Sequence, residues 1–222
     1  KQLYFALDGP VPRAKMVQQR WRRFKGVPEA KYIEELKKKH NIPIEKEWDR
    51  TKISPGTEFM VQLADQLHKY MKKKEFGNCE VVLSDTLVPG EGEHKFMPLV
   101  RELVNTSDNV VIFSPDADLI VLSILSNKDN IYILRAPNKK QDPELYNRYS
   151  DEQFLYLSID ICKKYFIEDL SDEYDKKIDL NKMTLDFTFL TFLCGNDFVL
   201  PMQYLRMSNN PREDGFGKIK KI

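Results

Sequence analysis

Six acidic side chains in this 222-residue sequence have the type and spacing that metal-dependent chemistry requires. Four of them form two pairs, and in each pair one residue separates the two acids. The other two are single acids beside a Gly or an Asn. The six are Asp8, Glu91, Glu93, Asp116, Asp118 and Asp197. Carboxylates gathered in one place repel each other unless cations neutralise them. A set of Asp and Glu without His or Cys favours magnesium or manganese over zinc. Two such ions roughly 3.5–4 Å apart can activate a water and stabilise the leaving oxygen in phosphodiester hydrolysis, which is the chemistry we predict.

The chain alternates short β-rich apolar runs with longer helical patterns, which is typical of βαβ units and a largely parallel sheet. We therefore expect an α/β fold, with a mostly parallel central sheet flanked by helices, in a single domain spanning residues 1–222. The expected strands are residues 3–7, 81–83, 110–113, 131–134 and 154–157. The expected helices are residues 12–25, 57–73, 93–104, 117–125, 159–166 and 182–193, and the aromatic and leucine side chains of residues 187–193 should lie in the core.

These elements place the acids at the ends of strands. Asp8 directly follows the first expected strand, and Asp116 and Asp118 follow residues 110–113. The carboxyl ends of parallel strands lie along one edge of a sheet, so these side chains should converge there. The two glutamates come shortly after another strand, and the glycines beside them let the backbone approach a ligand closely. Asp197 ends an apolar helix at Gly-Asn, and we expect it at the same edge.

Each of these side chains also has a simpler interpretation. A single Asp after a strand or helix is usually a turn residue or a cap, which applies to Asp8 and Asp197. Asp116 and Asp118 could cap the helix that follows them. His94, beside the glutamates, could contact a phosphate, but a single His at a helix start is more often structural. Metal binding is favoured for the whole set, because little else in the sequence would neutralise the clustered charge.

A polar stripe follows on the first expected helix. Lys15, Gln19, Arg22 and Arg23 are spaced i, i+4, i+7 and i+8, so they share one helical face. Arginine forks match phosphate oxygens, and the helix starts four residues after Asp8, so the stripe predicts a pocket for a terminal phosphate. Holding a 5′-phosphate there would place the first scissile bond over the metals, so that one nucleotide is removed at a time. Capped or triphosphorylated ends should fit such a pocket poorly. The alternative is a solvated amphipathic face.

The overall composition excludes several classes of protein. The 35 basic and 34 acidic residues nearly balance, which argues against a basic nucleic-acid coat and against a disordered acidic chain. The three cysteines are far apart and never form Cys-x-x-Cys, so neither a disulfide framework nor a zinc ribbon is indicated. Without a signal peptide or an apolar run of spanning length, we expect an intracellular protein, in the cytoplasm rather than the nucleus, with no membrane partner.

Seven motifs resemble the Xrn-type 5′→3′ exoribonuclease family and occur in that family's order. They are residues 7–16, 18–20, 22–24, 54–60, 89–95, 116–120 and 195–198. The resemblance implies a PIN-like α/β nuclease core that degrades 5′-monophosphorylated single-stranded RNA processively to mononucleotides, using two magnesium (or manganese) ions. It also implies that the six acids are metal ligands and catalytic residues, that the polar stripe lines the 5′-phosphate pocket, and that decapping or adaptor proteins are partners.

The sequence departs from the family's pattern in several places. The family has an upstream catalytic aspartate and a base-stacking histidine, and neither is present before Lys1. The family's downstream stacking aromatic would lie beyond Ile222, so we expect a catalytic core that is incomplete at both ends. Trp21 replaces a residue that is more often small, and we expect its indole to pack rather than to stack on RNA. Val199 interrupts the Leu-Pro that usually follows Asp197-Phe198.

Two other functions compete with this interpretation. A structure-specific 5′ nuclease that cuts DNA flaps shares the acidic α/β core, but a pocket for a terminal phosphate does not suit an end that must thread through. A catalytically inactive RNA-binding module on the same fold would have no reason to keep six acids next to RNA.

Overall fold

The computed structural model describes residues 1–44, 48–73, 75–139, 143–149, 154–171, 179–196, 199–203 and 205. Within it the chain forms two compact units, Lys1–Phe96 and Met97–Ile222, and each is described by itself. Whether the two behave as one domain stays a prediction. No helix among the described residues is both long enough and apolar enough to cross a lipid bilayer.

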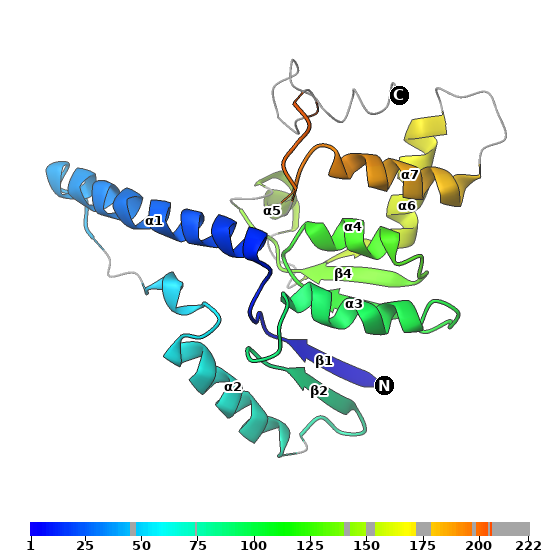
Figure 1. Ribbon diagram of the computed structural model, residues 1–222, viewed down its shortest axis with the longest axis horizontal. Coiled ribbons are helices and arrows are strands. Elements are labelled where there is room, and N and C mark those ends of the chain that lie inside the picture. The colour runs from blue at the N-terminus through cyan, green and yellow to red at the C-terminus, as the bar shows by residue number, and fades with distance from the viewer. Residues whose placement is uncertain are drawn as a thin grey trace. The chain divides into compact units, whose positions relative to one another are not determined.

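The first unit is built on a pair of parallel strands, as predicted. Strand β1 (Gln2–Ala6) pairs with β2 (Glu80–Ser84), with Tyr4 opposite Val82. The connection between the strands runs through three helices, which are α1 (Arg13–Lys39), the 3-10 helix η1 (Arg50–Lys52) and α2 (Glu58–Met71) (Figure 1). At the start of α2 the Thr57 hydroxyl accepts a hydrogen bond from the Met60 N–H at 3.4 Å, which caps the helix.

Helix α1 is longer than predicted. The sequence pattern predicts an end at residue 25, yet the helix continues through Gly26 and Pro28 to Lys39. Proline removes one helical hydrogen bond and usually kinks or ends a helix. Here the residues that follow it are mostly strong helix formers. Two exposed ion pairs add small support, one across Pro28 (Lys25–Glu29, 3.3 Å) and one after it (Glu34–Lys38, 2.8 Å).

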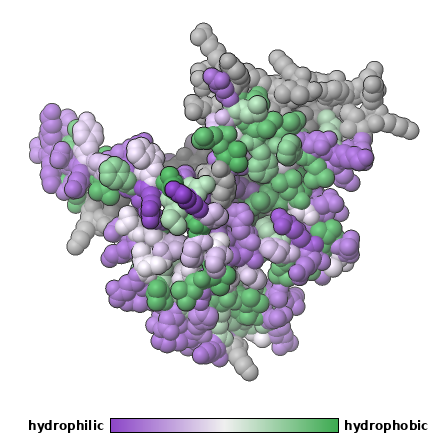
Figure 2. Space-filling view, in the orientation of Figure 1, coloured by the Kyte–Doolittle hydropathy of each residue, from purple (hydrophilic) through white to green (hydrophobic). Residues whose placement is uncertain are grey.

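The outer side of α1 carries aromatic side chains. Trp21 and Phe24 are 69% and 71% exposed and stack on each other, with ring centroids 6.3 Å apart. The Trp21 indole therefore packs on the neighbouring Phe24 ring, as the sequence analysis expected it to pack, but it remains largely exposed and is not part of a core. In Figure 2 the surface over α1 is mainly hydrophilic with apolar side chains among the polar ones.

The second unit also contains a parallel pair. Strand β3 (Val110–Phe113) pairs in parallel with β4 (Ile131–Arg135), and β5 (Leu155–Ser158) adds to β4 in the antiparallel sense. Helix α3 (Gly92–Glu102) begins in the first unit and ends in the second. The later helices are α4 (Asp118–Leu125), α5 (Pro143–Tyr149), α6 (Ile159–Ser171) and α7 (Leu180–Phe192). The α/β fold class is confirmed, while η1 and α5 were not predicted.

Helices α6 and α7 share a small core around Phe187 and Cys194. Phe166 of α6 lies against Phe187, with ring centroids 5.8 Å apart. The expectation that the whole 187–193 run is buried is wrong at Phe189, which is 66% exposed. On a helix only one face of such an apolar run can turn inward.

Candidate metal and phosphate site

Asp8 lies at the carboxyl end of β1, where the sequence places it. The parallel pairing continues one residue beyond the strand, because the Leu7 N–H donates to the Ser84 carbonyl at 2.9 Å. The exposed Asp8 carboxylate then accepts a hydrogen bond from the Gly92 N–H at 2.8 Å. This bond joins the strand end to the start of α3, with Glu91 just before the helix and Glu93 in its first turn.

Two glycines allow the backbone segments to meet here. The Gly9 N–H donates to the Gly90 carbonyl at 2.9 Å, and the Gly90 N–H donates to the Pro10 carbonyl at 2.8 Å. Gly90 has φ +110°, a conformation that L side chains rarely adopt. A Cβ atom on Gly9 would collide with the carbonyl oxygen of Val88. Gly9 and Gly90 are therefore needed for the position of Asp8.

Lys95 ties the ends of the two strands together from the side of α3. Its Nζ donates to the Leu7 carbonyl at 2.5 Å and to the Asp85 carbonyl at 2.7 Å. Burial lowers the pKa of Lys95, and the charges of Asp8 and Asp85 act in the opposite direction. Sequence reasoning missed this residue, although its place in the Gly-Glu-Gly-Glu-His-Lys run was a signal.

Asp85 is itself held by a histidine. His68 Nε2 lies 3.0 Å from Asp85 Oδ2, and Asp85 Oδ1 accepts from the Leu87 N–H at 2.9 Å. The hydrogen bond to His68, and then the one from Leu87, lower the pKa of Asp85 below its ordinary 3.8. A depressed carboxyl pKa stabilises the fold above the ordinary value and stops doing so as the pH falls through the folded-state pKa.

The pH dependence of stability should show this contribution. We expect Asp85→Asn to lower the free energy of unfolding relative to the wild type at pH 6, and the difference to shrink as the pH falls below about 3.8. Urea titrations from pH 3 to pH 7 would measure it. Asp65→Asn is the matched control, because Asp65 pairs with Lys69 on the exposed surface of α2 and its loss should matter little. An Asp85→Asn difference that stays constant over this pH range would contradict the prediction.

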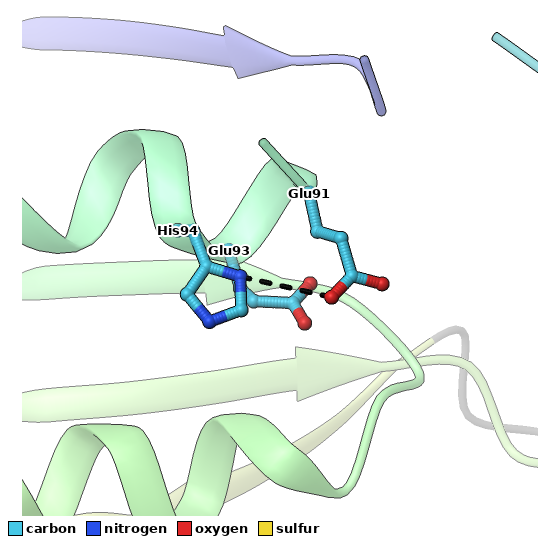
Figure 3. Close-up of side chains that lie close together, drawn as sticks. All are labelled: Glu91, Glu93 and His94. Atoms are coloured by element: carbon cyan, nitrogen blue, oxygen red, sulfur yellow. Dashed lines mark ion pairs between the residues drawn. The ribbon is translucent and has the colours of Figure 1, made fainter. Parts of the chain in front are cut away.

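Glu91, Glu93 and His94 form a compact cluster of potential metal ligands (Figure 3). One ligand atom from each lies within 4.8 Å of the other two. Opposite ligands of an octahedral magnesium ion are about 4 Å apart, so a single cation could contact members of this set. Glu91 is 6% exposed, and its Oε2 atom accepts no hydrogen bond from any residue that the structure describes, although it lies 3.7 Å from His94 Nδ1. His94 was expected to be structural, and its nearness to Glu91 and Glu93 now makes it a candidate ligand.

The polar stripe of α1 reaches this cluster through Lys15. Lys15 Nζ lies 3.0 Å from Glu91 Oε1, and both side chains are less than one-tenth exposed. Gln19 is also buried, Arg23 is half-buried and Arg22 is exposed. Buried polar side chains are unusual on a helix face that only meets water, so the simple solvated-face interpretation does not fit Lys15 and Gln19.

Asp116 lies in the loop that follows β3, and Asp118 is the first residue of α4. Both side chains are exposed, and the Asp118 N–H donates to Asp116 Oδ1 at 3.4 Å. The N-cap position of α4 is Ala117, and its side chain makes no capping hydrogen bond, so capping by Asp116, the alternative noted from the sequence, extends only to this contact with the first residue of the helix. Asp197 lies outside the described residues. The structure therefore brings Asp8, Glu91 and Glu93 together in one unit and Asp116 and Asp118 in the other, and the meeting of all six stays a prediction.

The chain is similar to a family of nucleases over most of its length. Residues 1–137 match the family model described as "XRN 5'-3' exonuclease N-terminus". The "5'-3' exoribonuclease 2" of Kluyveromyces lactis is 31% identical over 252 residues, covering 95% of this chain and 25% of the relative. The "5'-3' exoribonuclease 1" of Schizosaccharomyces pombe is 33% identical over 241 residues, covering 100% of this chain and 18% of the relative. The "5'-3' exoribonuclease 2 homolog" of Caenorhabditis elegans is 33% identical over 249 residues, covering 89% and 26%. The chain thus spans about a quarter or less of the length of these relatives.

Proposed function

The chain belongs to the XRN 5′-3′ exonuclease family, and on that premise we propose that it is the catalytic core of an enzyme that hydrolyses RNA from the 5′ end with the help of divalent metal ions. The observation that carries this proposal is the direct contact between the two predicted subsites. Lys15 of the polar stripe lies 3.0 Å from Glu91 of the acidic cluster. An enzyme that holds the 5′-phosphate while cutting the next bond needs this adjacency.

The donor set fits magnesium or manganese. Asp8, Glu91 and Glu93 offer carboxylate oxygens, and the buried Glu91 Oε2 atom has no hydrogen-bond donor within the described part of the chain. Asp116, Asp118 and Asp197 complete the proposed ligand set for two ions. Bound metal would supply Lewis-acid stabilisation of the leaving oxygen and a more acidic water. Lys95 and the Gly92 N–H hold Asp8 and the strand ends in place for this task.

The polar stripe gives the enzyme its direction. Lys15, Gln19, Arg22 and Arg23 bind the terminal phosphate, with the arginines as two-pronged donors to its oxygens. The phosphate then fixes the first internucleotide bond at the acids, so that one mononucleotide leaves at a time. A cap or a triphosphate is too large for the same pocket. The proposed substrate is therefore single-stranded RNA with a 5′-monophosphate, the kind of end that a decapping partner would produce.

The proposal has a direct test in the preference for the 5′ end. The full-length protein with magnesium should degrade 5′-monophosphorylated RNA faster than the same RNA with a 5′-hydroxyl, and Arg22→Ala with Arg23→Ala should reduce that ratio at least about tenfold, since each charged contact to phosphate is worth roughly 1.5–3 kcal/mol. Lys31→Ala on the same helix is a control outside the stripe. An unchanged ratio of rates would refute the pocket.

Two other outcomes of the same experiment separate the rival functions. Faster cleavage of flap DNA than of matched RNA would point to a structure-specific 5′ nuclease. Tight RNA binding without hydrolysis in magnesium or manganese would point to an inactive binding module. An intracellular setting is also part of the proposal, supported by the three cysteines, all of which are free thiols.

A further inference from the structure

Lys15 and Glu91 form a buried ion pair between residues with different proposed tasks. The two side chains are 9% and 7% exposed, and Nζ lies 3.0 Å from Oε1. Lys15 belongs to the stripe that would bind the 5′-phosphate, and Glu91 belongs to the cluster that would bind metal. Separating the two side chains without a new partner for each would leave an uncompensated charge in a buried site, which is strongly unfavourable.

Glu91 is only partly satisfied by this pair. Among the described residues, none donates a hydrogen bond to its second oxygen, Oε2, which lies 3.7 Å from His94 Nδ1. A carboxylate can accept about four hydrogen bonds, so one lysine leaves much of its capacity unused. A divalent cation beside Glu91 and Glu93 would supply what the carboxylate lacks. It would also repel the Lys15 ammonium and weaken its attraction to Oε1.

We infer that the Lys15–Glu91 ion pair is an exchange contact that couples metal binding to 5′-phosphate binding. This inference rests on the proposed function. Without metal, Glu91 holds the Lys15 ammonium. When a cation takes Glu91, the ammonium turns to the terminal phosphate of the RNA. The metal ion thus takes Glu91 away from Lys15, and the phosphate takes Lys15 away from Glu91. By linkage, each ligand raises the affinity for the other by the same factor.

The exchange makes a prediction that a simple catalytic role for Glu91 does not. In EDTA, Glu91→Gln should bind adenosine 5′-monophosphate more tightly than the wild type does, by about tenfold, which is a typical coupling factor. The control is Glu93→Gln, which removes the same charge from the same motif but leaves the Lys15–Glu91 pair in place. Its affinity should rise less than about threefold. Isothermal titration calorimetry on the full-length protein would measure both, with circular dichroism to verify folding.

A second measurement tests the reciprocal effect. Magnesium should raise the affinity of the wild type for adenosine 5′-monophosphate by about tenfold, and the nucleotide should raise the affinity for magnesium equally. In Lys15→Met the magnesium-dependent gain should fall to less than about threefold. Equal affinities of the Glu91→Gln and Glu93→Gln variants in EDTA would overturn the exchange, and so would an unchanged gain in Lys15→Met.

The outcomes also separate this inference from the proposed function. A wild type that prefers the 5′-monophosphate over adenosine, together with equal Glu91→Gln and Glu93→Gln affinities, refutes the exchange alone. A wild type that binds adenosine 5′-monophosphate and adenosine equally refutes the phosphate pocket, and the exchange fails with it.

Discussion

Changing Asp8 or Glu93 to its amide should lower metal-dependent RNA hydrolysis by about a thousandfold. Each substitution removes a charged metal ligand, which removes several kcal/mol of transition-state stabilisation, and about 1.4 kcal/mol corresponds to tenfold in rate. Asp8→Asn is the sharper test, because the asparagine oxygen can still accept the Gly92 N–H that Asp8 Oδ1 accepts at 2.8 Å. The local structure should therefore persist while the charge is lost.

The measurement must separate a lost ligand from a misfolded site. Rates at saturating magnesium should fall, and the concentration of manganese needed for half-maximal binding should rise in a direct binding experiment. Asp65→Asn, on the exposed side of α2, is the matched acid-to-amide control and should leave both quantities unchanged. If Asp8→Asn retained wild-type hydrolysis at saturating magnesium, Asp8 would be a turn residue, as the simpler interpretation of the sequence held.

The position of Asp8 could be predicted because it depends mainly on local patterns. The strand β1 ends at Ala6, one residue before the predicted end at residue 7, and Asp8 follows directly after that predicted end. The parallel partner was also foreseeable, since parallel strands need a crossover of a dozen or more residues, usually helical, and the sequence predicts such a connection between the two strands. The same logic placed Asp116 and Asp118 after β3, with the strand limits as predicted.

The contacts that give the site its electrostatics could not be predicted in this way. The Lys15–Glu91 pair and the Lys95 bonds to Leu7 and Asp85 join residues that are distant in sequence. These contacts depend on where α1 and α3 lie with respect to the ends of β1 and β2, and no local sequence pattern encodes that position. Helical spacing showed that the stripe shares a face, but burial of Lys15 was visible only in the fold.

The error in the length of α1 has a different physical origin. Gly26 and Pro28 are stop signals by local propensity, and in isolation they would favour an end near residue 25. Propensity is a weak prior, and a proline inside a helix costs about 3 kcal/mol, which the surrounding helix can offset. The residues after Pro28 are mostly strong helix formers, so the helix forms on both sides of it.

Gly9→Ala should be the most damaging single-methyl change in the first unit. The added Cβ would collide with the Val88 carbonyl oxygen, which is backbone and has no rotamer to escape into, and it would come 3.2 Å from Lys95 Nζ. Overpacking of this kind costs about 3 kcal/mol. The strand end would have to move, and the Gly9–Gly90 hydrogen bond at 2.9 Å and the Asp8 carboxylate would move with it. We therefore expect lower stability and weaker manganese binding together.

Gly26→Ala provides the opposite result from the same chemical change. Gly26 lies inside α1, and a Cβ there would meet no atom of a described residue within 4 Å. Alanine loses less backbone entropy than glycine on helix formation, so this variant should be more stable by about 0.5–1 kcal/mol. Urea unfolding of both variants, with manganese titrations, measures the contrast. Equal stability of Gly9→Ala and the wild type would mean that the segments around Asp8 and Val88 do not approach as closely as the hydrogen bond between Gly9 and Gly90 requires. The proposed position of Asp8 beside Glu91 and Glu93 would then lose its main geometric support.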